Sequence, residues 1–345
     1  MNGRGLEARS IENSHCYLCG REGAALYENQ RDRLWNAPGV WSLMRCRDCD
    51  FIWINPKPVP EDIHKLYSDY FTHDIDHEAS GSLDFSRLCW KKKIRYSILR
   101  SGFNYNFAVP GFWAFTGKLL SSVSLLKELA GRSIMYLEGD RRGRLLDVGC
   151  GNGQFLSRMK GLGWDVYGTE PDPQAAGIAK GQMNLDKASY GMLEDIKYPD
   201  NYFDVITMNH VIEHVYDPVS TLQECRRILK PTGIIVIATP NINGLASRIF
   251  GENARHLEVP RHLFLFSPKS IKAVLVKSGF KLIRQRYTLE NTYIWKASYR
   301  ISREAPAGKV RIRKSERLLV SLFEYLACSL NKNLSEELFV VGGKA

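Results

Sequence analysis

The stretch Arg144-Leu-Leu-Asp-Val-Gly-Cys-Gly-Asn-Gly153 decides the fold of this chain. Its first half contains Leu145, Leu146 and Val148, a continuous apolar run typical of a parallel strand that is buried on both faces. Three alternate glycines follow, and a backbone without Cβ atoms can approach a ligand closely. Apolar residues at helical spacing come next. The stretch therefore predicts a strand, a glycine-rich turn and a helix, which together begin a nucleotide-binding α/β unit.

A second strand ending in an acid is predicted at Trp164–Glu170. Glu170 follows the glycine turn by about twenty residues, the spacing at which a carboxylate accepts hydrogen bonds from both ribose hydroxyls of a bound nucleoside. No Gly-Lys-Ser/Thr follows the glycines, which argues against a P-loop.

Three stretches in this order resemble the class I S-adenosylmethionine-dependent methyltransferases, namely Leu146–Gly153, Gly168–Asp172 and Phe203–Pro218. The resemblance extends over roughly residues 140 to 290 and the last strand. It implies an α/β fold with a Rossmann-like sheet of seven strands, mostly parallel with an antiparallel last strand. It also implies S-adenosylmethionine as the cofactor.

The same resemblance assigns roles around that cofactor. The glycine turn would seat its methionine end, and Asp147 would orient the turn through hydrogen bonds from loop amides, since a buried acid needs such partners. Leu193 would pack on the adenine ring, and either Glu194 or Asp195 would meet its amino group. The expected cofactor-binding residues are Asp147, Gly149, Gly151, Gly153, Glu170, Leu193, Glu194 and Asn209.

With 345 residues, the chain is too long for one domain of about 150 residues. We expect a zinc-binding module at 1–60, a helical linker or cap at 61–140 and the methyltransferase domain at 141–345. A helical insertion is expected at 291–334, before the last strand.

The zinc-binding module is predicted from two cysteine pairs, Cys16-x-x-Cys19 and Cys46-x-x-Cys49. Four thiolates in two such turns can enclose a tetrahedral zinc ion, as in a zinc ribbon. Such a site has no open position for water, so the Zn²⁺ would be structural. Reduced structural cysteines and an iron–sulfur cluster are the alternatives.

The net charge of +11 suggests an anionic partner: nucleic acid, a nucleotide-linked or diphosphate substrate, or a membrane surface. A merely solvated basic surface would give the same charge. The first twenty residues do not resemble a signal peptide, and no apolar run reaches about 18 residues. These features predict a soluble, cytoplasmic protein.

Two segments leave peripheral contact with the inner membrane face open. Residues 103–128 concentrate aromatic side chains, which suit a substrate cover, a membrane-interface element or a packed helical subdomain. Residues 309–330 predict a basic amphipathic helix that would bind an anionic membrane face or act as a lid or dimer contact.

The segment from His262 to Phe280 resembles bacterial sugar methyltransferases, some of which also carry a four-cysteine module. Those enzymes place a histidine here, and another at the position of His214, beside the methyl acceptor. This chain departs from the sugar C-methyltransferases because Arg261 stands where an acid often precedes the histidine. It also lacks a second large C-terminal domain, so we expect transfer to oxygen.

An imidazole suits the role of general base for a hydroxyl at neutral pH. His262 is the first candidate and His214 the second, although either could simply brace its loop. Arg255 and Arg261 could pair with a diphosphate or carboxylate of the substrate. The sequence thus favours methylation of a sugar hydroxyl in a nucleotide- or lipid-linked precursor of a surface polysaccharide.

Two other acceptors remain open. Zinc modules and positive charge also suit an RNA methyltransferase, but the aromatic cluster lies apart from most basic residues, so nucleic acid is not the favoured partner. A quinone-like lipid phenol is the other alternative, and it would be favoured if residues 103–128 lie in a membrane.

Overall fold

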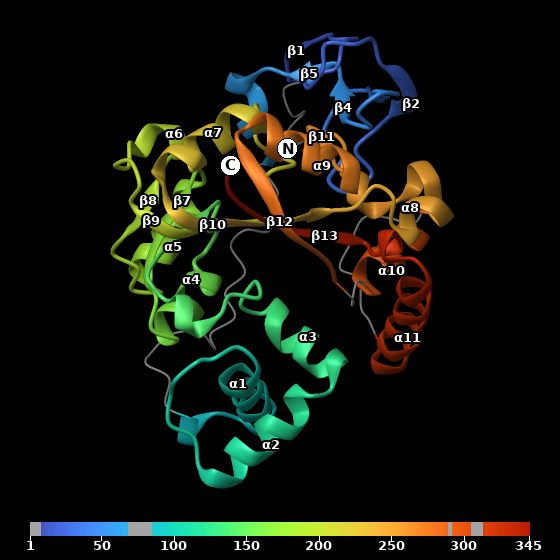
Figure 1. Ribbon diagram of the computed structural model, residues 1–345. Helices are drawn as coiled ribbons and strands as arrows, with labels where there is room; N and C mark the ends of the chain where they lie inside the picture. Colours follow the sequence, from blue (N-terminus) through green and yellow to red (C-terminus); the bar gives the residue numbers. More distant parts are fainter. Residues whose placement is uncertain (1–7, 68–84, 289–291, 305–312) are drawn as a thin grey trace, which may run out of the picture.

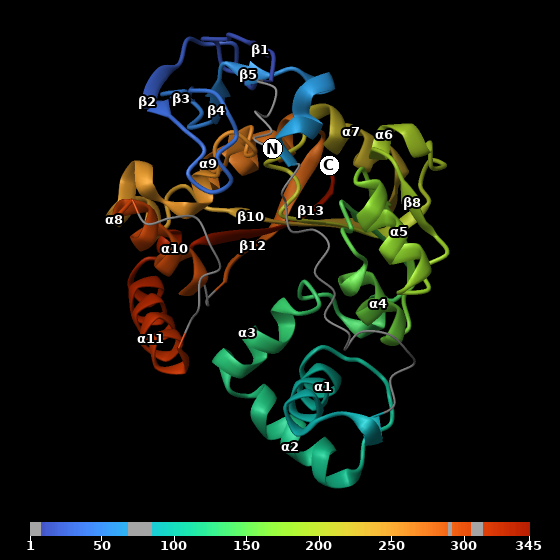
Figure 2. The ribbon, with the colours of Figure 1, turned by 180° about the vertical axis from the view of Figure 1, so that it is seen from behind.

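A computed structural model describes residues 8–67, 85–288, 292–304 and 313–345. Within them the chain forms a central seven-stranded sheet with helices on both faces (Figures 1 and 2). A four-stranded sheet built largely from the N-terminal residues lies on one side of this sheet, and a helical group lies on the other.

The central sheet has the strand order β12-β13-β10-β9-β6-β7-β8. Strands β10, β9, β6, β7 and β8 are mutually parallel, and β13 runs antiparallel to both of its neighbours. This arrangement confirms the predicted methyltransferase-type sheet. The strands are β6 (Arg144–Val148), β7 (Asp165–Glu170), β8 (Ala188–Tyr190), β9 (Phe203–Asn209), β10 (Leu229–Pro240), β12 (Phe280–Tyr287) and β13 (Glu337–Lys344).

Helices cover both faces of this sheet because its strands are apolar on both sides, as in β6, where the neighbours Leu145 and Leu146 are fully buried in different cores. Helices α7 and α9 contribute to the core on one face, and α4 and α5 to the core on the other. These helices are α4 (Gln154–Gly161), α5 (Pro173–Gly181), α7 (Pro218–Ile228) and α9 (Pro268–Lys277). The short helices α6 (Leu193–Ile196) and α8 (Leu245–Phe250) follow β8 and β10.

The four-stranded sheet combines strands that are far apart in the sequence. Its order is β11-β4-β3-β2, and its edge strand β11 comes from the segment before α9. Phe264 of β11 pairs with Trp53 of β4, and its ring stacks on Phe51 at 5.2 Å between centroids. The N-terminal strands are β1 (Ser10–Ile11), β2 (Ala24–Gln30), β3 (Trp41–Arg45), β4 (Ile52–Asn55) and β5 (Lys57–Pro58), and β11 spans Phe264–Leu265.

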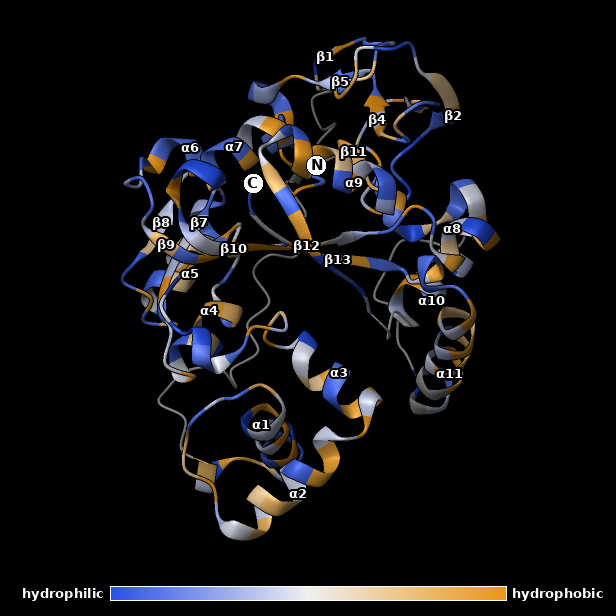
Figure 3. Cartoon of the chain, in the orientation of Figure 1, coloured by the Kyte–Doolittle hydropathy of each residue, from blue (hydrophilic) through white to orange (hydrophobic). Residues whose placement is uncertain are grey.

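The remaining helices carry apolar side chains on their surfaces (Figure 3). Helices α1 (Trp90–Gly102), α2 (Gly111–Ser121) and α3 (Ser124–Arg132) pack together. Helices α10 (Thr292–Ser302) and α11 (Lys314–Leu330) contact each other, and α10 also contacts α8. Exposed examples are Phe112, Phe115 and Leu119 of α2 and Leu322 and Leu326 of α11. In the described ranges, no helix has both the length and the apolar character that crossing a membrane demands.

Candidate active site

The glycine turn lies at the carboxyl end of β6, where ligands of open α/β sheets collect. Gly149, Gly151 and Gly153 all have left-handed φ values, of 67°, 54° and 81°. A Cβ on Gly149 would come within 2.6 Å of Val211, whereas one on Gly151 would meet nothing within 4 Å. The turn thus packs tightly against the protein at Gly149 and opens outward at Gly151, as a turn that cradles a cofactor should.

Replacing Gly151 by arginine should therefore eliminate S-adenosylmethionine binding, since the side chain would be strained at this φ and would fill the open space. Gly177→Arg is the matched control, because Gly177 lies on exposed helix α5 with no heavy atom within 4 Å of its Cβ position. Isothermal titration should find binding by the control and none by Gly151→Arg. Equal affinities in both variants would contradict this assignment of the turn.

Two carboxylates support the turn. Glu170, buried at the end of β7, accepts hydrogen bonds from the Gly151 amide (2.7 Å) and the Asp172 amide (2.9 Å). Asp147 accepts one from the Thr207 hydroxyl (2.6 Å), so a hydroxyl of β9 serves it in place of the expected loop amides. Burial raises the pKa of both acids, that of Asp147 to about 8. Each Glu170 oxygen keeps a second lone pair for ligand hydroxyls.

The other expected cofactor-binding residues lie on neighbouring strand ends. The Gly191 amide donates to the Glu170 carbonyl oxygen, which joins the turn before α6 to β7. Leu193 begins α6 and is buried, and the Glu194 carboxylate accepts a hydrogen bond from Thr221 (2.7 Å). Asn209 is exposed as the last residue of β9. These positions share one edge of the sheet with the glycine turn.

The two histidines predicted from sequence are brought together. The ring centroids of His214 and His262 are 4.7 Å apart. The Nδ1 atoms contact backbone carbonyl oxygens, His214 that of Arg261 (3.1 Å) and His262 that of His256 (2.7 Å). Since a carbonyl only accepts, each Nδ1 carries the proton, and Nε2 of a neutral ring keeps its lone pair.

His262 is neutral in this setting. Its side chain is almost completely buried, and burial together with the neighbouring His214 lowers its pKa well below the usual value. Ligand atoms of Glu213, His214 and His262 all lie within 4.8 Å of one another. The arrangement therefore offers a buried nitrogen base beside a second imidazole and a carboxylate.

A third histidine, His210, follows β9 directly. Its ring bonds to Glu213 (3.2 Å) and Glu337 (2.8 Å). Burial opposes its protonation, but these two carboxylates outweigh that effect and raise its pKa to about 10. The pKa of Glu337 is lowered to about 2 despite burial, by His210 and Arg132. Arg132 also lies 3.5 Å from Glu337, so one imidazolium and one guanidinium balance the two carboxylates.

His256, in the same loop as His262, yields a pH-dependent stability. Burial, and the charge of Arg255, lower its pKa to about 4, so the unfolded chain binds its proton more readily. Its stabilising contribution is complete above pH 6.5 and is lost as the pH falls toward 4. The buried acids Asp147 and Glu336, with pKa values raised to about 8, act oppositely over this range.

We therefore expect the difference in unfolding free energy between the native chain and His256→Gln to grow by about 1.4 kcal/mol per pH unit from pH 4 to 6.5. Denaturant unfolding at several pH values measures it. His64→Gln, which removes an imidazole from an exposed position, is the control for the substitution itself. A constant difference for His256→Gln would mean that His256 titrates normally.

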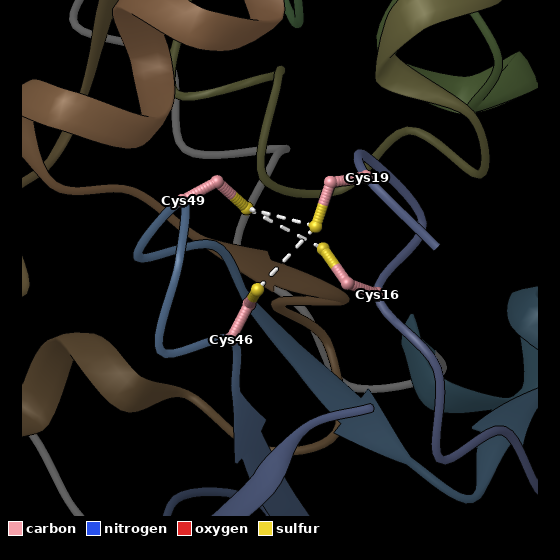
Figure 4. Close-up of side chains that lie close together, drawn as sticks. All are labelled: Cys16, Cys19, Cys46 and Cys49. Carbon is pink, nitrogen blue, oxygen red and sulfur yellow. Dashed lines mark hydrogen bonds between the residues drawn. The ribbon is translucent and has the colours of Figure 1, made fainter. Parts of the chain in front are cut away.

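The four predicted cysteines converge from two separate turns (Figure 4). Their sulfur atoms lie 3.5 Å apart in the pairs Cys16–Cys49 and Cys19–Cys46, and 3.8 Å apart in the pair Cys19–Cys49. All four lie within 4.8 Å of one another. Zn–S bonds of about 2.3 Å in a tetrahedron place sulfurs about 3.8 Å apart. The donor set and its spacing fit a closed zinc site.

The predicted arginines have different surroundings. Arg261 is fully buried and pairs with Asp32 (2.7 Å), which is also fully buried, so it is engaged within the fold and does not face a substrate. Arg255 pairs with Glu258 (2.6 Å) and lies beside a cavity. The partnership of Arg261 with Asp32 was not predicted, because nothing local in the sequence links residues so far apart.

Comparison with known proteins identifies similar sequences and structures. Residues 123–285 match the family model described as a methyltransferase domain. The ubiquinone biosynthesis O-methyltransferase of Rhodopseudomonas palustris is 38% identical over 122 residues, which are 34% of this chain and 46% of that protein. The protein of the same name from Cereibacter sphaeroides is 31% identical over 164 residues, 44% of this chain and 66% of that protein. The chain thus spans about half the length of the Rhodopseudomonas relatives it matches.

Two solved structures are similar to this chain at lower sequence identity. A SAM-dependent methyltransferase from Archaeoglobus fulgidus is 24% identical, with a TM-score of 0.44 over 68% of this chain and 100% of that one. A possible histamine N-methyltransferase from Thermotoga maritima is 19% identical, with a TM-score of 0.40 over 68% of this chain and 100% of that one. The glycine turn, Glu170, His214 and His262 all fall inside the residues matched by the family model.

Proposed function

We propose that the chain is an S-adenosylmethionine-dependent methyltransferase that transfers a methyl group to a phenolic oxygen of a quinone-type precursor, a proposal that the family match and the order of the sheet support. The names of the curated relatives support this acceptor better than the sugar hydroxyl that the sequence favoured. An acceptor of that class was the phenolic alternative among the sequence-based expectations.

The neutral, buried His262 carries the proposal. A base with a lowered pKa removes a proton most readily from an acidic hydroxyl, and a phenol has a pKa of about 10, as in tyrosine. A sugar hydroxyl is a much weaker acid and needs a stronger base. His262 therefore matches a phenol, with Nδ1 fixed on the His256 carbonyl and Nε2 available to accept the proton.

The residues at the sheet edge fit S-adenosylmethionine, which supplies an electrophilic methyl group when it is bound. Gly151 and its neighbours would leave room for the methionine part, Glu170 would accept the ribose hydroxyls, and Leu193 would border the adenine. The remaining contribution of the protein is to align the acceptor oxygen with the methyl group and to exclude water.

We further propose that Cys16, Cys19, Cys46 and Cys49 hold one structural Zn²⁺, and that the chain divides into the module, helical region and methyltransferase domain expected from the sequence. The exposed apolar side chains of α2 support peripheral contact with a membrane that presents a lipid-linked acceptor. A cytoplasmic location would give access to the inner membrane face.

The test is methyl transfer by the full chain from labelled S-adenosylmethionine to three acceptors: catechol, a nucleotide-linked hexose and transfer RNA. We expect labelled product with catechol. Label in the hexose alone would restore the sugar hypothesis, and label in transfer RNA alone would overturn both small-molecule readings.

A further inference from the structure

A small cavity lies where the N-terminal module meets the methyltransferase region. Its walls come from the end of β2 and the residues after it, from part of the segment between Glu252 and Val259, and from Ile301 of α10. The residues at and after the end of β2 are Gln30, Arg31, Arg33 and Leu34. Figure 1 shows β2, α8 and α10 on the same side of the molecule. The cavity has a volume of about 30 Å³, enough for one small polar group.

Three arginines line this cavity. Arg31 and Arg33 are exposed residues of the module, and Arg33 also donates a hydrogen bond to Asn253. The third, Arg255, is only 12% exposed, and its Nε atom is buried without a hydrogen-bond partner in the described part of the chain. A buried cationic donor that lacks an acceptor favours an anionic group that would supply one.

Each carboxylate in the lining has at least one partner, although Glu258 Oε1 makes no hydrogen bond in the described part of the chain and lies 3.6 Å from Nε of Arg261. Glu258 pairs with Arg255 at 2.6 Å, and Glu252 accepts a hydrogen bond from Gln30 at 3.2 Å. The lining holds three guanidinium groups and two carboxylates, which leaves it with a positive balance of charge.

The cavity is adjacent to the proposed base. Glu258, which lines it, has the same carboxylate oxygen 2.6 Å from Arg255 and 3.7 Å from Nε2 of His262. A molecule whose hydroxyl approaches the histidine pair can thus place a second group near these arginines.

We propose that this cavity binds an anionic group of the methyl acceptor, a carboxylate or a phosphate ester. That the bound molecule is the methyl acceptor rests on the proposed function. It assigns the N-terminal module a part in recognition: Arg31 and Arg33 of the module and Arg255 of the methyltransferase domain hold the anion together.

The test compares the full-length double variant Arg31→Gln/Arg33→Gln with the control Arg21→Gln/Arg141→Gln, which removes the same charge from exposed positions outside the cavity lining. Titration with inorganic phosphate and with acetate measures anion binding without any methyl transfer. Kinetics then use catechol, 3,4-dihydroxybenzoate and 3,4-dihydroxybenzyl phosphate. The first variant should bind the preferred anion at least about tenfold more weakly than the control. It should raise KM for the catechol that carries this anionic group by a similar factor. The value of kcat for that substrate, and both kinetic constants for uncharged catechol, should change little.

The preferred arm identifies the anion as carboxylate or phosphate. Equal anion affinity and equal KM values in the two double variants would overturn the inference, even if catechol is methylated and the proposed function stands. Anion binding that is lost only in Arg31→Gln/Arg33→Gln, with no catechol methylated, would support the anion site and reject the proposed function.

Discussion

Replacement of His262 by glutamine is expected to lower kcat for methyl transfer to catechol by about 10²–10⁴-fold, the usual contribution of a general base. Glutamine keeps a polar side chain of similar reach but cannot accept the proton. The affinity for S-adenosylmethionine should be unchanged, because His262 approaches the sheet edge from the loop before β11 and the glycine turn follows β6. Steady-state kinetics and calorimetric titration of the cofactor measure the two effects separately.

His256→Gln is the matched control, since His256 is a buried histidine of the same loop that bonds to Ser247 (2.5 Å) and not to the histidine pair through its ring. It should lose stability but retain kcat to within a few-fold. A further signature is pH: with a pKa well below 6.5, His262 should sustain the rate below pH 6.5, where an ordinary histidine would become protonated. Equal losses of kcat in both variants would indicate that the loop, and not a base at 262, was disturbed.

The sheet was predictable because its signals are local. The run from Leu145 to Val148 encodes a doubly covered strand by itself, and the glycine turn follows within the same ten residues. Likewise, the spacing within the two cysteine pairs is by itself enough to predict that the four sulfur atoms lie together. Short-range pattern was therefore sufficient to predict both the sheet and the sulfur cluster.

The surroundings of the histidines were not predictable, because they depend on contacts between distant segments. Glu337 meets His210 only because β13 inserts antiparallel between β10 and β12, which brings its first residue to the carboxyl end of β10. Asp32 meets Arg261 only because the N-terminal module packs against the loop that carries Arg261. A sequence pattern shows neither the order of the strands nor which segments pack together. Arg261 was therefore predicted to bind a substrate anion, whereas in the structure it forms an internal ion pair with Asp32.

Removal of the metal from the cysteine cluster is expected to lower methyl transfer by about a hundredfold or more, although the cluster contains no catalytic residue. The reason is continuity: strand β4 follows Cys49 and pairs with β11, which begins two residues after His262. Metal binding by such small modules contributes directly to their folding free energy. Without it, β4 and the Asp32–Arg261 pair would lose their support, and a shift of about 1 Å at the base can cost a factor of about 10² in rate.

Cys46→Ser tests this continuity against Cys89→Ser, which changes an exposed cysteine outside the cluster. Metal analysis should find one zinc ion per chain in the control and none in Cys46→Ser. The cofactor should still bind to Cys46→Ser, since its expected ligands lie on β6, β7 and α6, away from β4. A zinc-free chain with unchanged kcat would show that β11 holds its position through the methyltransferase core alone. Loss of methyl transfer with retained cofactor binding would instead show that the module holds the residues around His262 in place. This is the result expected from the pairing of β4 with β11.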